Sequence, residues 1–155
     1  PFPSVQPDSY MIVRSRHVVL FLACILIMIG GCSSPVEMMI QGNDQMNGGG
    51  NPAVVRIYQL SGEVSFTQAT AEVFWEDDIA QVSGELIGRP QDLTIFPGES
   101  RTIEVEPSEN AQFIGFAADL RNPTPNRWRS IHAVSDLKGK EVTVEILEDR
   151  LDVTF

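Results

Sequence analysis

The chain has two cysteines, and their surroundings limit the chemistry that each thiol could perform. Cys32 ends the stretch Ile29–Cys32, which closes an apolar run, and Cys24 lies inside that run. If processing removes the run, Cys32 keeps no partner for an intramolecular disulfide. No general base stands beside it in the sequence, so an activated thiol is disfavoured as well.

The apolar run has the features of an export signal. Residues 1–10 match no pattern and are interpreted as upstream sequence in front of a start at Met11. Residues 14–17 then supply two arginines and a histidine, and Val18–Ile29 is apolar throughout. As a helix this run would span about 18 Å, too short for a hydrocarbon core of about 30 Å. A buried core helix or a membrane anchor is disfavoured because small residues close the run.

The motif Ile29–Cys32 resembles the bacterial lipobox, in which an aliphatic residue and two small residues precede the cysteine. The resemblance implies cleavage before Cys32, lipidation of its sulfur and acylation of the freed amine. Leu is the usual residue at the position of Ile29. The stretch Phe21–Cys24 is a weaker alternative, because cleavage there would leave an apolar stump. Ser33 follows the cysteine in place of an aspartate, which points to the outer membrane.

These features predict four parts: an upstream extension (1–10), a lipoprotein signal peptide (11–31), a lipidated tether (32–35) and one domain (36–155). The 155-residue chain carries a formal net charge of −10. Because such a chain repels phosphate backbones, nucleic-acid binding is disfavoured. Hydrophobic residues make up 43% of the chain, which suffices for a packed core.

The remaining chemically capable residues do not form a catalytic pattern. His132 is the one histidine of the predicted mature chain and lies in a predicted strand, and a zinc site needs more histidine or cysteine ligands. The acidic stretch Glu76–Asp78 lacks the ligand spacing of a calcium loop, which favours a solvated helix end. Gly48–Gly50 has no following Lys-Ser/Thr, so a phosphate cradle is disfavoured. We therefore expect no enzyme, no cofactor, no metal and no small-molecule substrate.

Trp128 stands between Arg127 and Arg129. The arrangement could serve as a cation–π contact site. A core tryptophan flanked by two surface arginines is the favoured interpretation.

The elements that must position any site are mostly strands. Period-2 alternation or continuous apolar runs predict about eight of them, at Val36–Gln41, Ala53–Leu60, Leu93–Phe96, 101–107, Gln112–Leu120, Asn126–Val134, 140–146 and 150–155. Helical spacing predicts one or two short helices within Ser65–Gly84, a type II turn is expected at Pro97-Gly98, and Gly42–Pro52 is expected to be a flexible loop. The fold class is therefore all-β, an antiparallel β-sandwich with a short helical insertion.

Several segments, taken in order, resemble the TssJ family, the outer-membrane lipoproteins of the type VI secretion system. They are the lipobox IGGC, the strand NPAVVRIYQL after a loop, SFTQATAEVFWEDD, the turn FPGES, FIGFAADLRNP and RWRSI. The resemblance covers Val36–Phe155. It implies a transthyretin-like β-sandwich on the periplasmic face of the outer membrane, acting as the anchor of the TssJ–TssL–TssM membrane complex.

The resemblance also implies a partner, the periplasmic C-terminal part of the inner-membrane protein TssM. In the family, the loop between the first two strands takes part in that contact, and it corresponds here to Gly42–Pro52. Its expected partner-binding residues are Asn43, Asp44, Gln45 and Met46, with Met46 as the one sizeable apolar group.

Two other functions stay open on the residues alone. The chain could be another lipid-anchored β-sandwich that serves as a ligand-binding or envelope-assembly module. It could also be a periplasmic enzyme, which would require a cleft that gathers His132 with several carboxylates.

Overall fold

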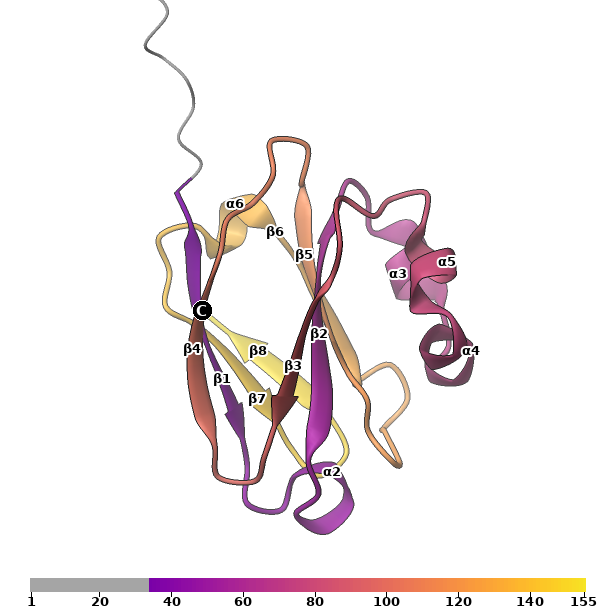
Figure 1. Ribbon diagram of the computed structural model, residues 1–155, viewed down its shortest axis with the longest axis vertical. Coiled ribbons are helices and arrows are strands. Elements are labelled where there is room, and N and C mark those ends of the chain that lie inside the picture. The colour runs from indigo at the N-terminus through magenta and orange to yellow at the C-terminus, as the bar shows by residue number, and fades with distance from the viewer. Residues whose placement is uncertain (1–33) are drawn as a thin grey trace, which may run out of the picture. The chain divides into compact units, whose positions relative to one another are not determined.

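A computed structural model describes residues 34–155, so the predictions for Cys24, Cys32 and the signal peptide lie outside the described residues. Within this part of the chain, two four-stranded sheets pack face to face (Figure 1), with strand orders β4-β1-β7-β8 and β3-β2-β5-β6. The strands are β1 (Val36–Gly42), β2 (Ala53–Leu60), β3 (Gln91–Ile95), β4 (Ser100–Val105), β5 (Phe113–Ala118), β6 (Arg129–Ala133), β7 (Val142–Ile146) and β8 (Leu151–Thr154). The helices are α2 (Met46–Gly49), α3 (Val64–Gln68), α4 (Ala71–Glu76), α5 (Asp78–Val82) and α6 (Val134–Leu137).

The β-sandwich predicted from the sequence is confirmed, with one difference in strand direction. All but one of the strand pairs in the two sheets are antiparallel, and the exception is β1 with β7. A parallel pair needs a long crossover connection. Here the whole second sheet lies between β1 and β7 in the sequence and supplies that connection.

Alternating side chains from both sheets fill the core. In β1 and β7 every second residue is buried, and Val55 and Ile57 of β2 are also buried. Inward-facing residues of facing sheets interdigitate in this way in any sandwich. The buried set of β1 and β7 comprises Val36, Met38, Ile40, Val142, Val144 and Ile146.

The helical insertion contains three short helices where one or two were predicted. It packs on the opposite side of β2, where Tyr58 contacts Phe66 and Phe74 with ring centroids 5.4 and 5.6 Å apart. Gly115 of β5 allows this close approach, because a Cβ there would lie 3.0 Å from the Phe66 ring.

The strand registers bring four connections to the same end of the sandwich, which we call the loop end. The loop end comprises residues 42–52, 96–99, 119–128 and 147–150. The seven-residue strand β1 runs from Val36 to this end. In Figure 1, α2 and the β3–β4 turn lie together at the bottom, while β1 begins near the top. The pairs that fix this arrangement are Gln41↔Ser100, Gly42↔Ile146, Ala53↔Ile95 and Val55↔Ala118.

Candidate partner-binding surface

The β1–β2 connection is a compact turn, not the open flexible loop that its composition predicted. Its glycine run supplies left-handed backbone, with φ of 70°, 94° and 86° at Gly48, Gly49 and Gly50. Other residues adopt this conformation at a steric cost. The Met46 carbonyl accepts hydrogen bonds from the amides of Gly50 at 2.8 Å and Asn51 at 3.1 Å, which closes the turn.

Asn47 joins this turn to two other connections of the loop end. Its side chain accepts a hydrogen bond from the Arg121 amide at 2.7 Å and donates one to the Pro52 carbonyl at 2.6 Å. Its own amide donates to the Leu147 carbonyl at 3.0 Å. Asn47 is 5% exposed and has a φ of 49°. The sequence analysis did not single it out, although an asparagine before a glycine run is a known signal for left-handed backbone.

The four predicted partner-binding residues differ in their exposure to solvent. Asn43, Asp44 and Gln45 are exposed at the loop end. Met46 has 0% exposed surface and belongs to the core. The prediction that Met46 is the apolar contact residue therefore needs correction: the turn directs its side chain inward, against Gly42 and Ile95.

The β3–β4 turn adjoins the β1–β2 connection. The Gly98 amide donates to the Gly42 carbonyl at 2.9 Å, and the Gly42 amide donates to the Glu99 carbonyl at 2.9 Å. Gly98 has a φ of 72°, and the Glu99 amide donates to the Phe96 carbonyl at 3.0 Å. Both features agree with the type II turn predicted at Pro97-Gly98.

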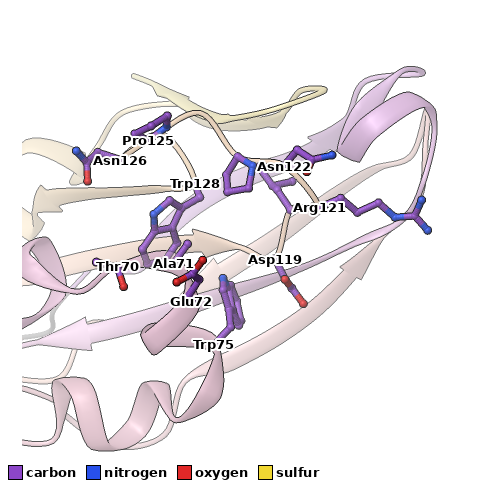
Figure 2. A pocket seen from close by; sticks show the side chains of 12 residues that line it. Thr70, Ala71, Glu72, Trp75, Asp119, Arg121, Asn122, Pro125, Asn126 and Trp128 are labelled. Atoms are coloured by element: carbon purple, nitrogen blue, oxygen red, sulfur yellow. The ribbon is translucent and has the colours of Figure 1, made fainter.

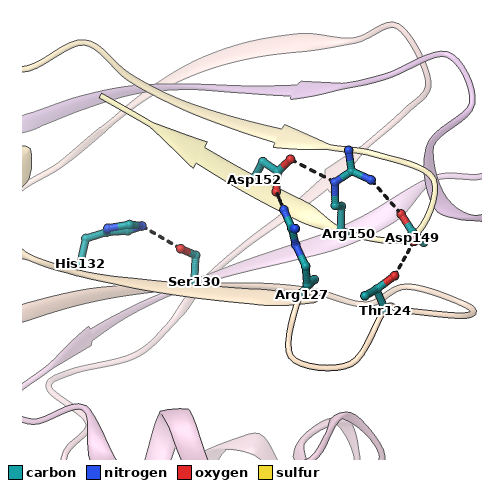
Figure 3. A network of polar contacts seen from close by, with 7 residues as sticks. All are labelled: Thr124, Arg127, Ser130, His132, Asp149, Arg150 and Asp152. Atoms are coloured by element: carbon teal, nitrogen blue, oxygen red, sulfur yellow. Dashed lines mark hydrogen bonds and ion pairs between the residues drawn. The ribbon is translucent and has the colours of Figure 1, made fainter.

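A polar network joins the other two connections of the loop end (Figure 3). Arg127 pairs with Asp152 at 2.5 Å, and Arg150 bridges Asp152 at 3.1 Å and Asp149 at 3.3 Å. The Thr124 hydroxyl donates to Asp149, and this hydrogen bond, followed by the charge of Arg150, lowers the pKa of Asp149. Exposed pairs of this kind stabilise weakly one by one. Together they fix residues 119–128 beside the β7–β8 hairpin.

A groove lies between α4 and residues 119–128 (Figure 2). It has a volume of about 760 Å³. Trp75 and Trp128 line it together with the carboxylates of Glu72 and Asp119. Among the described residues that line it there is no serine, cysteine or histidine, and the one hydroxyl side chain is that of Thr70.

In the acidic stretch Glu76–Asp78, Glu76 and Asp77 are exposed at a helix end, as predicted, but Asp78, the first residue of α5, is buried. Asp78 is 7% exposed, accepts a hydrogen bond from the Tyr58 hydroxyl at 2.5 Å and pairs with Arg56 at 2.7 Å. Arg56 also binds Asp92 at 2.6 Å, and that hydrogen bond is the main cause of its raised pKa. Asp78 thus ties the helical insertion to β2. No group of acidic, histidine or cysteine side chains within residues 34–155 is arranged to hold a metal ion.

The two remaining candidates, His132 and Trp128, both pack against neighbouring side chains of the fold. His132 Nε2 lies 2.7 Å from the Ser130 hydroxyl, its ring packs on Phe155, and burial lowers its pKa. Trp128 is 2% exposed, as predicted for a core residue. The guanidinium of Arg129 lies over its ring, 4.7 Å from the centroid, in a cation–π contact. Arg129 is half-buried and donates to the carbonyls of Phe66, Thr67 and Ala69 at the end of α3.

Residues 34–149 match the family model described as type VI secretion lipoprotein, VasD, EvfM, TssJ. The chain belongs to this family. The resemblance found in the sequence is thereby confirmed, and the family consists of structural lipoproteins of the secretion system, not of enzymes. The sequence-based alternatives, an unrelated lipid-anchored module and a periplasmic enzyme, lose their support. No helix within residues 34–155 has the length and apolarity needed to cross a membrane.

Solved structures share the fold of this TssJ-family chain. The type VI lipoprotein TssJ1 from Pseudomonas aeruginosa matches with a TM-score of 0.68 and 19% identity, over 79% of this chain and 95% of that one. A chain of a type VI membrane complex matches with a TM-score of 0.70 and 24% identity, over 78% and 98%. A chain of a structure described as the TssM C-terminal domain (869–1107) from EAEC matches with a TM-score of 0.67 and 23% identity, over 78% and 98%. No curated protein matched the chain.

Proposed function

We propose that this TssJ-family lipoprotein is the outer-membrane anchor of its type VI membrane complex and binds the periplasmic part of TssM through the loop end. The observation that carries the proposal is the position of Asn43, Asp44 and Gln45, which are exposed on a surface held by hydrogen bonds from three other connections. A surface that is ordered before binding loses little entropy when a partner contacts it.

The proposed lipid anchor gives this surface a direction. The predicted acceptor, Cys32, stands four residues before Val36 in the sequence. A four-residue tether reaches at most about 14 Å when extended, and β1 covers about 23 Å at about 3.3 Å per residue. With the start of β1 held close to the bilayer, the loop end projects into the periplasm, where a segment of an inner-membrane protein can reach it.

Binding of the full chain, solubilised in detergent, to the purified periplasmic fragment of TssM from the same organism tests this proposal. We expect a complex for the natural chain and at least about tenfold weaker binding when Asn43, Asp44 and Gln45 are all replaced by alanine. Deleting the connection is unsuitable, because Met46 and Asn47 belong to the core.

The matched control replaces three exposed residues far from the loop end, Glu109, Asn110 and Gln112, by alanine. It should bind like the natural chain. Failure of the natural chain to bind would reject the proposed function, and equal binding by the loop-end variant would place the contact elsewhere.

A further inference from the structure

Phe96 is an exposed aromatic side chain at the loop end. Its side chain is 54% exposed. Met46, the large apolar residue of the adjoining β1–β2 connection, is fully buried. An isolated exposed apolar residue needs no explanation in itself. What distinguishes Phe96 is the rigidity of the turn that carries it and the surface to which this turn belongs.

Glu99 holds the backbone of Phe96 from both sides of the turn. The Glu99 amide donates to the Phe96 carbonyl at 3.0 Å, while the Phe96 amide donates to the Glu99 carboxylate at 2.9 Å. The other carboxylate oxygen binds Arg101 at 2.6 Å. The bond from the Phe96 amide and then the bond from Arg101 lower the pKa of Glu99, so the carboxylate stays charged and keeps both partners. The turn is therefore ordered without a partner.

The turn is also fastened to the predicted contact loop. A Cβ added to Gly42 would lie 2.6 Å from the Phe96 carbonyl, so the two backbones touch there. The Asp44 carboxylate lies over the turn, 3.0 Å from the place that a Cβ of Gly98 would occupy. Phe96 and Asp44 thus belong to one continuous surface with fixed spacing.

Rigid, exposed aromatic residues make good interface anchors. Binding immobilises few additional bonds, and burial of the ring removes apolar surface from water. Asp44 of the adjoining connection adds a negative charge to this surface, whereas the charge of Glu99 is paired with Arg101. A partner that suits this surface therefore offers an apolar pocket for one ring, bordered by cationic side chains or backbone N–H groups.

We propose that Phe96 is the apolar anchor of the contact with the periplasmic partner and inserts into such a pocket, taking the place that the sequence analysis gave to Met46. The inference rests on the proposed function, because it identifies a residue of the same contact. It adds the β3–β4 turn to a surface that sequence reasoning limited to the β1–β2 connection.

Binding of Phe96→Ala and Val64→Ala, both as full chains in detergent, to the immobilised TssM periplasmic fragment tests the inference. Val64 is the matched control, because it is likewise 54% exposed and lies beyond the opposite end of β2. We expect Phe96→Ala to weaken binding at least about tenfold through faster dissociation. Val64→Ala should stay within about twofold of the natural chain, and Phe96→Leu should retain most of the affinity because it keeps an apolar side chain of similar reach.

The outcomes separate the two proposals. If the natural chain does not bind, the proposed function fails, and the inference fails with it. If the natural chain binds and Phe96→Ala binds equally well, the inference alone is overturned. Equal losses in Phe96→Ala and Val64→Ala also overturn it, because they indicate a general effect of lost apolar surface. Unchanged melting temperatures of both variants exclude unfolding as the cause, since both side chains are exposed.

Discussion

At the scale of single residues, the loop end depends on the chemistry of Asn47. Its side chain must donate to the Pro52 carbonyl and accept from the Arg121 amide, while its backbone has a φ of 49°. Asparagine meets all three demands. Glycine would keep the backbone conformation but lose both hydrogen bonds, and aspartate would place a carboxylate against the Pro52 carbonyl.

Asn47→Ala is expected to lower the free energy of unfolding by about 1–3 kcal/mol, because the partly buried Arg121 amide loses its acceptor. Urea denaturation of the natural and variant chains measures the difference. The control, Asn110→Ala at an exposed site, should change the stability by less than about 0.5 kcal/mol. Equal stabilities of Asn47→Ala and the natural chain would show that the connections hold together without this side chain.

At the scale of elements, a buried polar group orients the helical insertion on the second sheet. Tyr58 of β2 contributes its ring to the contact with Phe66 and Phe74 and its hydroxyl to Asp78 of α5. Arg56, two residues before Tyr58 on β2, pairs with the same carboxylate. The aromatic contacts bury apolar surface between the insertion and β2. The hydrogen-bonded group fixes the placement of α5, because unpaired buried charges are costly.

This arrangement predicts a loss of stability at high pH. Burial, followed by the hydrogen bond to Asp78, raises the pKa of Tyr58 above its ordinary value of 10.0. The unfolded chain therefore releases the Tyr58 proton at a pH where the folded chain retains it. The contribution of Tyr58 is complete below about pH 10 and decreases as the pH rises further.

We expect the free energy of unfolding to fall more steeply between pH 10 and pH 12 in the natural chain than in Tyr58→Phe, which has no proton to lose at this position. Urea denaturation at several pH values in this range measures both slopes. Tyr58 is the single tyrosine of residues 34–155, so no other tyrosine of the domain contributes. Parallel slopes for the two chains would contradict the assignment.

At the scale of the whole molecule, the proposed function requires two attachments, a lipid at one side of the domain and a protein at the other. The sandwich between them is a rigid spacer, because its two sheets share one continuous core. Such an anchor needs no chemistry of its own, and the family to which the chain belongs consists of structural lipoproteins.

For the lipid attachment, we expect Cys32→Ser to abolish labelling by radioactive palmitate in cells and to move the protein from the membrane to the soluble fraction. Cys24→Ser serves as the control and should leave both properties unchanged, because Cys24 lies inside the predicted signal peptide. Continued labelling of Cys32→Ser would falsify the assignment of Cys32 as the acceptor.

The fold class and most of the strands could be predicted from local sequence patterns alone. Alternation at Val142, Val144 and Ile146 predicts a strand with one buried face, and the structure confirms it, because a period of two is a local property of extended backbone. The family could also be recognised from local motifs. Strand pairing, by contrast, joins residues far apart in the chain, so the parallel contact of β1 with β7 was not predictable in this way.

The residues that form the candidate site depend on contacts between distant segments of the chain. In the sequence, Met46 and Phe96 are equivalent apolar residues beside turns. Met46 faces inward because glycine-rich backbone turns it toward Gly42 and Ile95, while Phe96 faces outward because Glu99 and Gly42 fix its turn against the other connection. The direction of a side chain at a turn depends on partners from distant segments, and those partners are set by sheet register, not by local sequence.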